Sequence, residues 1–214
     1  MKKALIYFLL CCPCFVSAQI GIKAGANFAN VSSASSINSS SKSGFVVGLF
    51  LATPGKKIIG SKTELQYSRQ GYDYKTSTNT GNVKLDYLLQ TQLMCINITK
   101  FVQLQFGAQT AILLSANADS TKTSSGSSGS YSQVMDFYNK FDYGYALGAE
   151  IHPYKGLLIG ARYNVSLAKV YKDVQSFQRP SFTSEDAKNN IVQIFAGWHF
   201  GKYAKKKDKE DKSN

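Results

Sequence analysis

The sequence predicts an all-β fold, an antiparallel up-and-down transmembrane β-barrel of about eight strands. Three observations lead to this fold class. Eight segments alternate apolar and polar residues with the period of two that places successive side chains on opposite faces of a strand. Short turns and long polar loops connect these segments in alternation, which is typical of barrels that cross a membrane. After residue 18, no apolar run reaches the ~18 residues that a membrane-spanning helix requires.

The first residues have the layout of a removable export signal. A basic start is followed by an apolar stretch from Ala4 to Val16, and the small residues Ser17 and Ala18 come before the expected cleavage. Because the stretch is shorter than the ~20 residues of a bilayer-spanning helix and contains Pro13, a helical anchor is disfavoured. Three cysteines within the signal leave a lipoprotein as an alternative.

We expect three segments along the chain: a signal peptide at 1–18, an outer-membrane β-barrel domain at 19–201 and a charged, disordered periplasmic tail at 202–214. Only Cys95 remains after cleavage, so no intramolecular disulfide is possible. The formal net charge of the whole chain is +12. For an exported barrel, this charge favours contact with anionic lipid headgroups, and we expect no nucleic-acid partner.

Alternation assigns the two faces of seven of the strands. Apolar residues at every second position are expected to face lipid, and the small or polar residues between them are expected to face the lumen. The lipid-facing sets run from Ile20 to Phe28, Phe45 to Leu51, Ile59 to Tyr67, Val102 to Ile112, Tyr143 to Ile151, Leu157 to Val165 and Val192 to Phe200.

The fourth strand, expected at 85–98, has an ambiguous pattern. Leu88 and Leu89 are adjacent, and the polar residues Gln90, Thr91 and Gln92 follow them. A β-bulge in this segment would restore the alternation.

The connections predict the orientation of the barrel. Short turns are expected at 53–56, 97–100 and 152–156, and long loops at 31–43, 70–82, 115–140 and 166–189. Because bacterial barrels combine short periplasmic turns with long extracellular loops, both ends of the chain are expected in the periplasm. A soluble sandwich or a lipocalin-like barrel is the alternative, but its outer surface would then be the glycine-rich, charged face.

Charged side chains of both signs fall on the face assigned to the lumen. A buried charge is tolerated when it is paired and hydrogen-bonded, and eight strands leave an interior that side chains can fill. We therefore expect a structural charge network that plugs the barrel, with a narrow pore or a binding pocket as the alternative. Its predicted members are Lys23, Lys62, Glu64, Asp142, Glu150 and Arg162.

No catalytic, cofactor-binding or metal site is predicted. The two histidines, His152 and His199, fall at the periplasmic ends of strands, in a turn and at the end of the lumen respectively. The chain has no glycine-rich phosphate loop, paired-cysteine motif or His-Glu-x-x-His signature. We therefore expect a protein without enzymatic activity and without a cofactor.

Several strand sequences resemble the PorT-type outer-membrane β-barrel family. They are IGIKAGANFANVSS, TELQYSRQGYDY, LQFGAQTAILLSA, DYGYALGAEI, GLLIGARYNVSLAKV and NNIVQIFAGWHF. The resemblance implies an outer-membrane barrel of about eight strands, with Phe200 as the aromatic residue of the C-terminal strand that acts in barrel assembly. The sequence LDYLLQTQLMCI departs from the Tyr-Leu-x-Ile-Pro-Leu pattern that is usual in the family.

Together these features predict an integral outer-membrane protein that serves as a non-catalytic scaffold for surface loops. A component of a protein secretion or surface-attachment assembly is one alternative. An outer-membrane lipid-modifying enzyme and a soluble periplasmic ligand-binding barrel are two others. The expected partners are outer-membrane lipids, with cell-envelope or secretion-system proteins as further candidates.

Overall fold

The computed structural model contains nine β-strands. It describes residues 19–32, 38–53, 58–75, 79–122, 128–132, 138–171 and 188–200, so the expected signal peptide and tail lie outside the described residues. The strands are β1 (Gln19–Ser32), β2 (Asn38–Ala52), β3 (Ile59–Lys75), β4 (Asn79–Asn97), β5 (Val102–Lys122), β6 (Ser128–Ser132), β7 (Phe141–Tyr154), β8 (Leu157–Ser166) and β9 (Lys188–Phe200).

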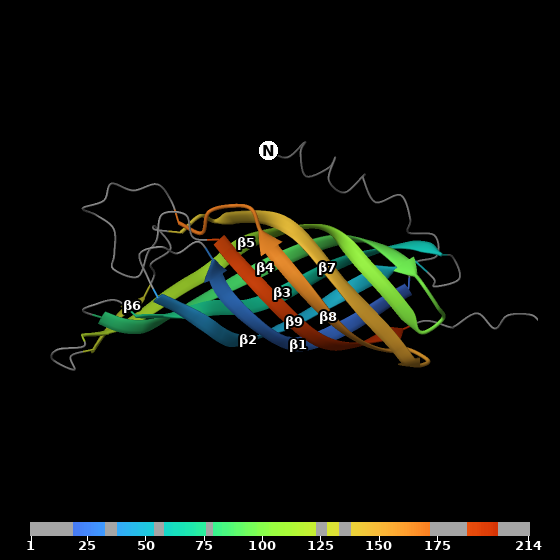
Figure 1. Ribbon diagram of the computed structural model, residues 1–214, viewed down its shortest axis with the longest axis horizontal. Coiled ribbons are helices and arrows are strands. Elements are labelled where there is room, and N and C mark those ends of the chain that lie inside the picture. Colours follow the sequence, from blue (N-terminus) through green and yellow to red (C-terminus); the bar gives the residue numbers. More distant parts are fainter. Residues whose placement is uncertain are drawn as a thin grey trace, which may run out of the picture.

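Eight of these strands close into an antiparallel barrel (Figure 1). Each pairs with its neighbours along the chain, with β5 pairing directly to β7. The first and last strands complete the ring, because β1 pairs with β9 from Ile20 opposite Phe200 to Ser32 opposite Lys188. The short strand β6 pairs with the far end of β5 and lies outside the ring. The predicted fold class is thereby confirmed, and no helix among the described residues is long and apolar enough to cross a membrane.

The barrel has two unlike ends. At the turn end, strands are joined by the short connections 53–58, 98–101 and 155–156, and both Gln19 and Phe200 lie there. At the loop end, β3, β4, β5 and β6 extend past the other strands, on the left of Figure 1.

Three of the predicted long loops contain strand in place of much of the expected loop. In the loop expected at 31–43, residues 31–32 belong to β1 and residues 38–43 to β2. The loop expected at 70–82 is mostly a ladder between β3 and β4, which pair as far as Lys75 opposite Thr80. The loop expected at 115–140 contains the end of β5 and all of β6. The polar residues of these segments predict loops, but strands beyond a membrane can carry polar residues on their solvent face while the other face stays apolar.

The predicted faces of seven strands agree with the burial pattern, while the fourth strand differs. Along β4, residues alternate regularly from Val83 to Cys95, with the odd-numbered side chains buried in the lumen. The expected bulge is absent from β4 and lies in β5 instead, where Leu114 is the extra residue opposite Asp86 and Tyr87. The pattern of this strand is ambiguous because it carries apolar side chains on both faces, with Leu89 inside and Leu88 outside.

The described lumen is filled in three layers. Near the turn end is a small apolar cluster made of Phe50, Ala52, Leu158 and Phe195. Charged and amide side chains occupy the middle of the barrel. A larger apolar cluster, here called the cap, fills the loop end and consists of Tyr72, Val83, Leu85, Tyr87, Leu89, Ala111, Leu113, Ala116, Ala118, Tyr138, Val170 and Tyr171.

Candidate functional site in the barrel lumen

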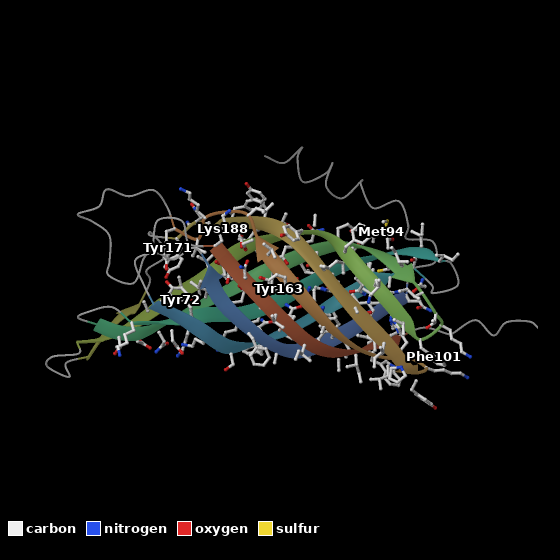
Figure 2. All side chains as sticks on the ribbon, viewed as in Figure 1. Tyr72, Met94, Phe101, Tyr163, Tyr171 and Lys188 are labelled. Atoms are coloured by element: carbon white, nitrogen blue, oxygen red, sulfur yellow. The ribbon has the colours of Figure 1, made fainter. Side chains whose placement is uncertain are left out.

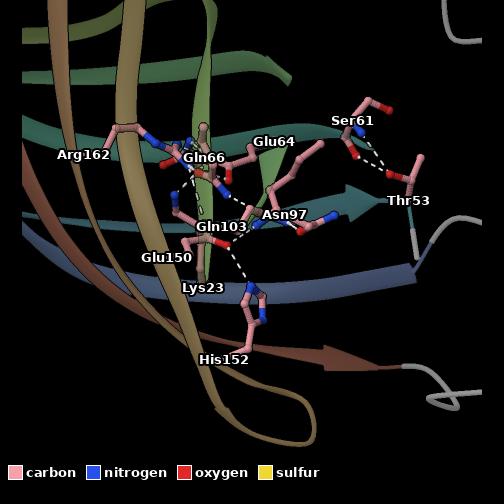
Figure 3. Close-up of polar contacts among 12 residues, drawn as sticks. Lys23, Thr53, Ser61, Glu64, Gln66, Asn97, Gln103, Glu150, His152 and Arg162 are labelled. Carbon is pink, nitrogen blue, oxygen red and sulfur yellow. Dashed lines mark hydrogen bonds and ion pairs between the residues drawn. The ribbon is translucent and has the colours of Figure 1, made fainter. Parts of the chain in front are cut away.

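Five of the six predicted lumen charges meet in the middle layer (Figure 3). Period-two alternation turns each of them inward, from four different strands around the ring. All five residues are at most 2% exposed. The five, here called the lumen charge network, are Lys23 on β1, Lys62 and Glu64 on β3, Glu150 on β7 and Arg162 on β8.

Glu64 is the centre of this network. The guanidinium of Arg162 donates to both of its carboxylate oxygens, with Nη1 at 2.6 Å from Oε2 and Nη2 at 3.0 Å from Oε1. Lys23 Nζ and the Gln66 amide donate to Oε2 at 2.9 and 2.8 Å. Arg162 also donates to Gln105 Oε1 at 2.7 Å. A forked pair of this kind fixes both partners in orientation as well as in distance.

A second pair joins strands β3 and β7. Lys62 Nζ donates to Glu150 Oε2 at 2.6 Å. Arg162 Nη2 lies 3.9 Å from Glu150 Oε1, which links this pair to the first. On the turn side, His152 Nε2 lies 3.8 Å from Glu150 Oε2. The two carboxylates thus share contacts with all three cations of the network.

Two phenylalanines provide aromatic faces for the cations. Lys23 Nζ lies 3.8 Å from the centroid of the Phe195 ring, and the Arg162 guanidinium carbon lies 5.1 Å from the same ring. Lys62 Nζ lies 4.9 Å from the centroid of Phe50. Because three cations face two carboxylates, these rings offer the surplus positive charge a favourable electrostatic surface.

The sixth predicted member, Asp142, lies apart from the other five. Its carboxylate accepts a hydrogen bond from the Ser166 hydroxyl, on the neighbouring strand β8. Asp142 opens β7 near the loop end, whereas Glu150 lies further along the same strand toward the turn end. The two residues share a face of β7 but differ in depth within the barrel.

Both histidines lie at the turn end of the lumen, and the ring of His152 is directed toward Glu150 (Figure 3). His152 lies within β7 and not in a turn as expected, because β7 continues to Tyr154. Its ring centroid is 5.8 Å from that of His199, which in turn packs edge-on against Phe50 at 4.7 Å. Phe200, the predicted C-terminal aromatic, ends β9 opposite Ile20 and faces outward, 52% exposed.

Between the lumen charge network and the cap, amide and hydroxyl side chains are connected by a series of hydrogen bonds. Asn27 and Gln70 both donate to the Ser68 hydroxyl, at 2.8 and 2.9 Å, and Asn189 donates to Gln70 Oε1 at 2.5 Å. The side chains of these four residues come from β1, β3 and β9. These hydrogen bonds link β1, β3 and β9 across the lumen, at a depth between the charged layer and the cap.

The cap is held by tyrosine hydroxyl groups at its centre. Tyr72 on β3 hydrogen-bonds to Tyr171, which follows β8, and to Tyr138, which precedes β7, the latter at 3.1 Å. Figure 2 shows Tyr72 and Tyr171 close together at the loop end. All three residues are at most 4% exposed. The chain segments on either side of the β7–β8 hairpin therefore fold inward over the lumen.

Alternation placed Gln66 and Gln105 on the lumen face, as the structure does, but did not include them in the charge network. Thr91 was missed because the faces of the fourth strand could not be assigned. Tyr138 and Tyr171 lie outside the regular strands, and only the three-dimensional structure brings them to Tyr72.

Among the described residues we looked for groups of side chains that could hold a metal ion or act in catalysis. No group of three or more His, Cys, Asp or Glu side chains among them could hold a metal ion. Cys95 is a free cysteine with its side chain buried in the lumen. The chemistry that this arrangement supports is ion pairing and hydrogen bonding between strands.

Comparisons with known proteins agree with the barrel. The family described as "Outer membrane protein beta-barrel domain" matches residues 16–172. No curated protein matches the sequence. Among solved structures, Ail, the attachment invasion locus protein of Yersinia pestis, is 18% identical with a TM-score of 0.50, over 86% of this chain and 100% of that one.

Two other solved structures are similar with lower scores. Neisserial surface protein A is 17% identical, with a TM-score of 0.49 over 85% of this chain and 97% of that one. The outer membrane protein OprG from Pseudomonas aeruginosa is 13% identical, with a TM-score of 0.44 over 86% of this chain and 96% of that one. At these identities the likeness concerns the fold alone.

Proposed function

Because this chain belongs to the family of outer membrane protein beta-barrel domains, we propose that it is a closed, non-conducting scaffold whose loop end presents binding segments outside the cell. One observation carries this proposal: the described lumen is occupied at successive depths by the lumen charge network and by the cap. The barrel then contributes stability and position, and binding belongs to the segments at the loop end. The proposal includes no catalytic step.

Occupation at two depths opposes conduction for two different reasons. An ion crossing the middle layer would have to separate pairs such as Arg162 and Glu64, whose charges lose their partners as it passes. At the cap it would meet Tyr72, Leu85 and Tyr87, which offer an apolar layer in place of water. A narrow pore would need both layers to open together.

Planar-bilayer recording tests the closed lumen. The unmodified protein should give no steady current, and the double variant Glu64→Gln with Arg162→Gln should also stay closed because the cap remains. Steady ohmic channels from the unmodified protein would contradict the scaffold proposal and favour a pore. The gel mobility of unheated samples serves as the control that each preparation contains folded barrels.

Epitope tags test which end is outside. A tag after Gly126, in the connection between β5 and β6, should be stained by antibody on intact cells. A tag between Lys155 and Gly156, at the turn end, and a tag after Lys212 should be stained only when the outer membrane is opened. The reverse pattern would show an inverted barrel and would remove the proposed role of the loop end.

We propose further that the chain is a PorT-type member of the family, with a cell-envelope or secretion-system protein as its partner. The support for this finer assignment is the set of strand sequences from IGIKAGANFANVSS to NNIVQIFAGWHF. Crosslinking in intact cells, followed by purification and mass spectrometry, tests it. Reproducible capture of one secretion-system component would support the assembly role, and recovery of the barrel alone would favour the isolated scaffold.

A further inference from the structure

The outer wall of the barrel carries a polar seam on β4 that faces the membrane. The outward side chains of β4 include Leu88, Gln90, Gln92 and Met94 in succession. Both glutamines thus lie between apolar residues along the strand, inside the apolar band of the barrel and not at its rim. Gln92 is exposed and Gln90 is half-buried against its neighbours.

Threonines on the adjacent strands complete the seam. Thr63 on β3 lies opposite Gln92 and donates to its Oε1 at 2.6 Å. Thr110 on β5 lies opposite Gln90 and donates to its Oε1 at 3.3 Å. The polar seam therefore consists of Thr63, Gln90, Gln92 and Thr110, on three neighbouring strands.

The hydrogen bonds within the seam use little of its capacity. A glutamine amide has two N–H donors and two acceptor lone pairs, and each glutamine here makes one described side-chain hydrogen bond through its carbonyl oxygen. The N–H donors of Gln90 and Gln92 have no partner among the described residues. Lipid tails offer no acceptor, so a polar group that faces them is costly unless another protein surface supplies one.

The opposite wall has no such feature among the described residues. On β9, four strands away around the ring, the outward residues Val192, Ile194, Ala196 and Trp198 are all apolar. This contrast makes the seam a property of one side of the barrel. Ordinary contact with lipid would favour the composition of β9 on both sides.

We propose that the polar seam is the contact surface between two copies of this chain within the outer membrane. A second copy is the occupant that the chemistry favours, because an amide pairs with an identical amide through reciprocal N–H to carbonyl bonds. Two barrels inserted in the same direction place equal residues at equal depth. A twofold axis along the membrane normal then brings Gln90 to Gln90 and Gln92 to Gln92 of the second copy.

The surface beside the seam permits close approach. Ala108 lies directly opposite Gln92 on β5 and faces outward, so it presents one methyl group beside the amide. Small side chains at the contact between membrane segments let the backbones come close enough for polar groups to pair. Leu88 and Met94, which flank the two glutamines along β4, can then close apolar surface around the amides.

Photo-crosslinking in intact cells tests this contact. The photoreactive residue p-benzoylphenylalanine replaces Met94, which lies beside the seam on the outer surface (Figure 2), or Ile194 on the opposite wall as the matched control. We expect an adduct of two copies of this chain, identified by mass spectrometry, from position 94 and not from position 194. Equal adducts from both positions, or no self-adduct from position 94, would overturn the proposal.

Variants of the seam separate the amides from their surroundings. The double variant Gln90→Leu with Gln92→Leu should reduce the self-adduct from position 94 on the order of tenfold. The reason is that each hydrogen bond between protein segments inside a membrane strengthens their association by roughly a few-fold. The matched double variant Thr63→Val with Thr110→Val keeps the amides and should keep the adduct.

Each remaining outcome also decides the question. A self-adduct that persists in the leucine variant would show that the amides do not make the contact. An equal loss of the self-adduct in the valine variant would show that the threonine hydroxyl groups, and not the amides alone, make the contact. An adduct from position 94 with a different protein would contradict the proposal and show that the seam binds another partner. Heat-dependent gel mobility confirms that each variant is a folded barrel, and the single variant Gln92→Leu provides a milder test.

Discussion

At the scale of single residues, Arg162 connects more of the lumen than any one of its partners does. Its guanidinium contacts both oxygens of Glu64, the amide oxygen of Gln105 and the ring of Phe195. Removing it leaves Glu64 with Lys23 as its remaining cation. A buried carboxylate that loses a forked partner has no water to replace it.

We predict that Arg162→Gln lowers the free energy of unfolding by about 3–5 kcal/mol. Arg69→Gln is the matched control, because Arg69 forms an ion pair of 2.8 Å with Asp86 on the exposed outer side of the barrel. That variant should cost less than about 1 kcal/mol, since solvent screens an exposed pair. Urea titration of the folded barrel in lipid vesicles measures both.

Adding Glu64→Gln to Arg162→Gln should recover part of the lost stability, because the uncompensated carboxylate is then removed. Equal losses for Arg162→Gln and Arg69→Gln would contradict the assignment of Arg162 to a buried structural network.

Alternation predicted the direction of these side chains but not their depth. It placed Glu150 and Asp142 on the same face of one strand, and both do face inward. Depth depends on the stagger between neighbouring strands, which a period of two does not encode. The contact of Glu150 with Lys62, on another strand, could therefore not be foreseen. Asp142 and Glu150 lie eight positions apart on one strand, so their sequence separation already places them at different depths.

At the scale of elements, the β7–β8 hairpin depends on one glycine. Gly156 adopts a φ of +89°, a conformation that glycine tolerates and other residues rarely adopt. A methyl group there would lie 2.9 Å from Cε2 of Trp198 on β9. The carbonyl of Gly156 also accepts a hydrogen bond of 2.8 Å from the backbone N–H of His199, so the turn is fixed to the last strand.

We predict that Gly156→Ala destabilises the barrel by about 1–2 kcal/mol, through backbone strain and displacement of the Trp198 ring. Lys155→Ala, in the same two-residue turn, is the control and should stay within about 0.5 kcal/mol of the unmodified protein. Urea unfolding followed by tryptophan fluorescence measures both, since Trp198 is the only tryptophan. If Gly156→Ala matched Lys155→Ala, the turn would be adaptable.

The fourth strand shows where element prediction from sequence ended. A single-face rule, with apolar residues toward lipid, holds where the lumen is polar, as along β1 and β8. At the loop end β4 reverses that rule, because the lumen there is filled by the cap. The bulge at Leu114 keeps Ala116 and Ala118 of β5 turned into that same apolar layer. Only a knowledge of the cap would have predicted either feature.

At the scale of the whole molecule, the pairing of β1 with β9 closes the ring, so that no barrel strand has an unpaired edge along the ring. Each transmembrane strand therefore has hydrogen-bonded neighbours on both sides. Unfolding has to break a complete ladder before any strand can separate. Local fraying is correspondingly disfavoured within the ring.

We predict that unheated and boiled samples in SDS migrate differently on a gel, because the closed ladder resists the detergent until it is heated. Circular dichroism of the unheated sample should be dominated by strand. The same sample after boiling is the control for the unfolded mobility. Identical migration combined with a helical spectrum would contradict a closed barrel.

The tyrosine contacts of the cap also bear on how this protein can change over time. Tyr138 and Tyr171 fasten the chain to the barrel on the two sides of the β7–β8 hairpin, through Tyr72. Both contacts meet at the single hydroxyl group of Tyr72. Loss of that one group would release both segments together, so selection on the shape of the loop end acts more strongly on Tyr72 than on either of its partners.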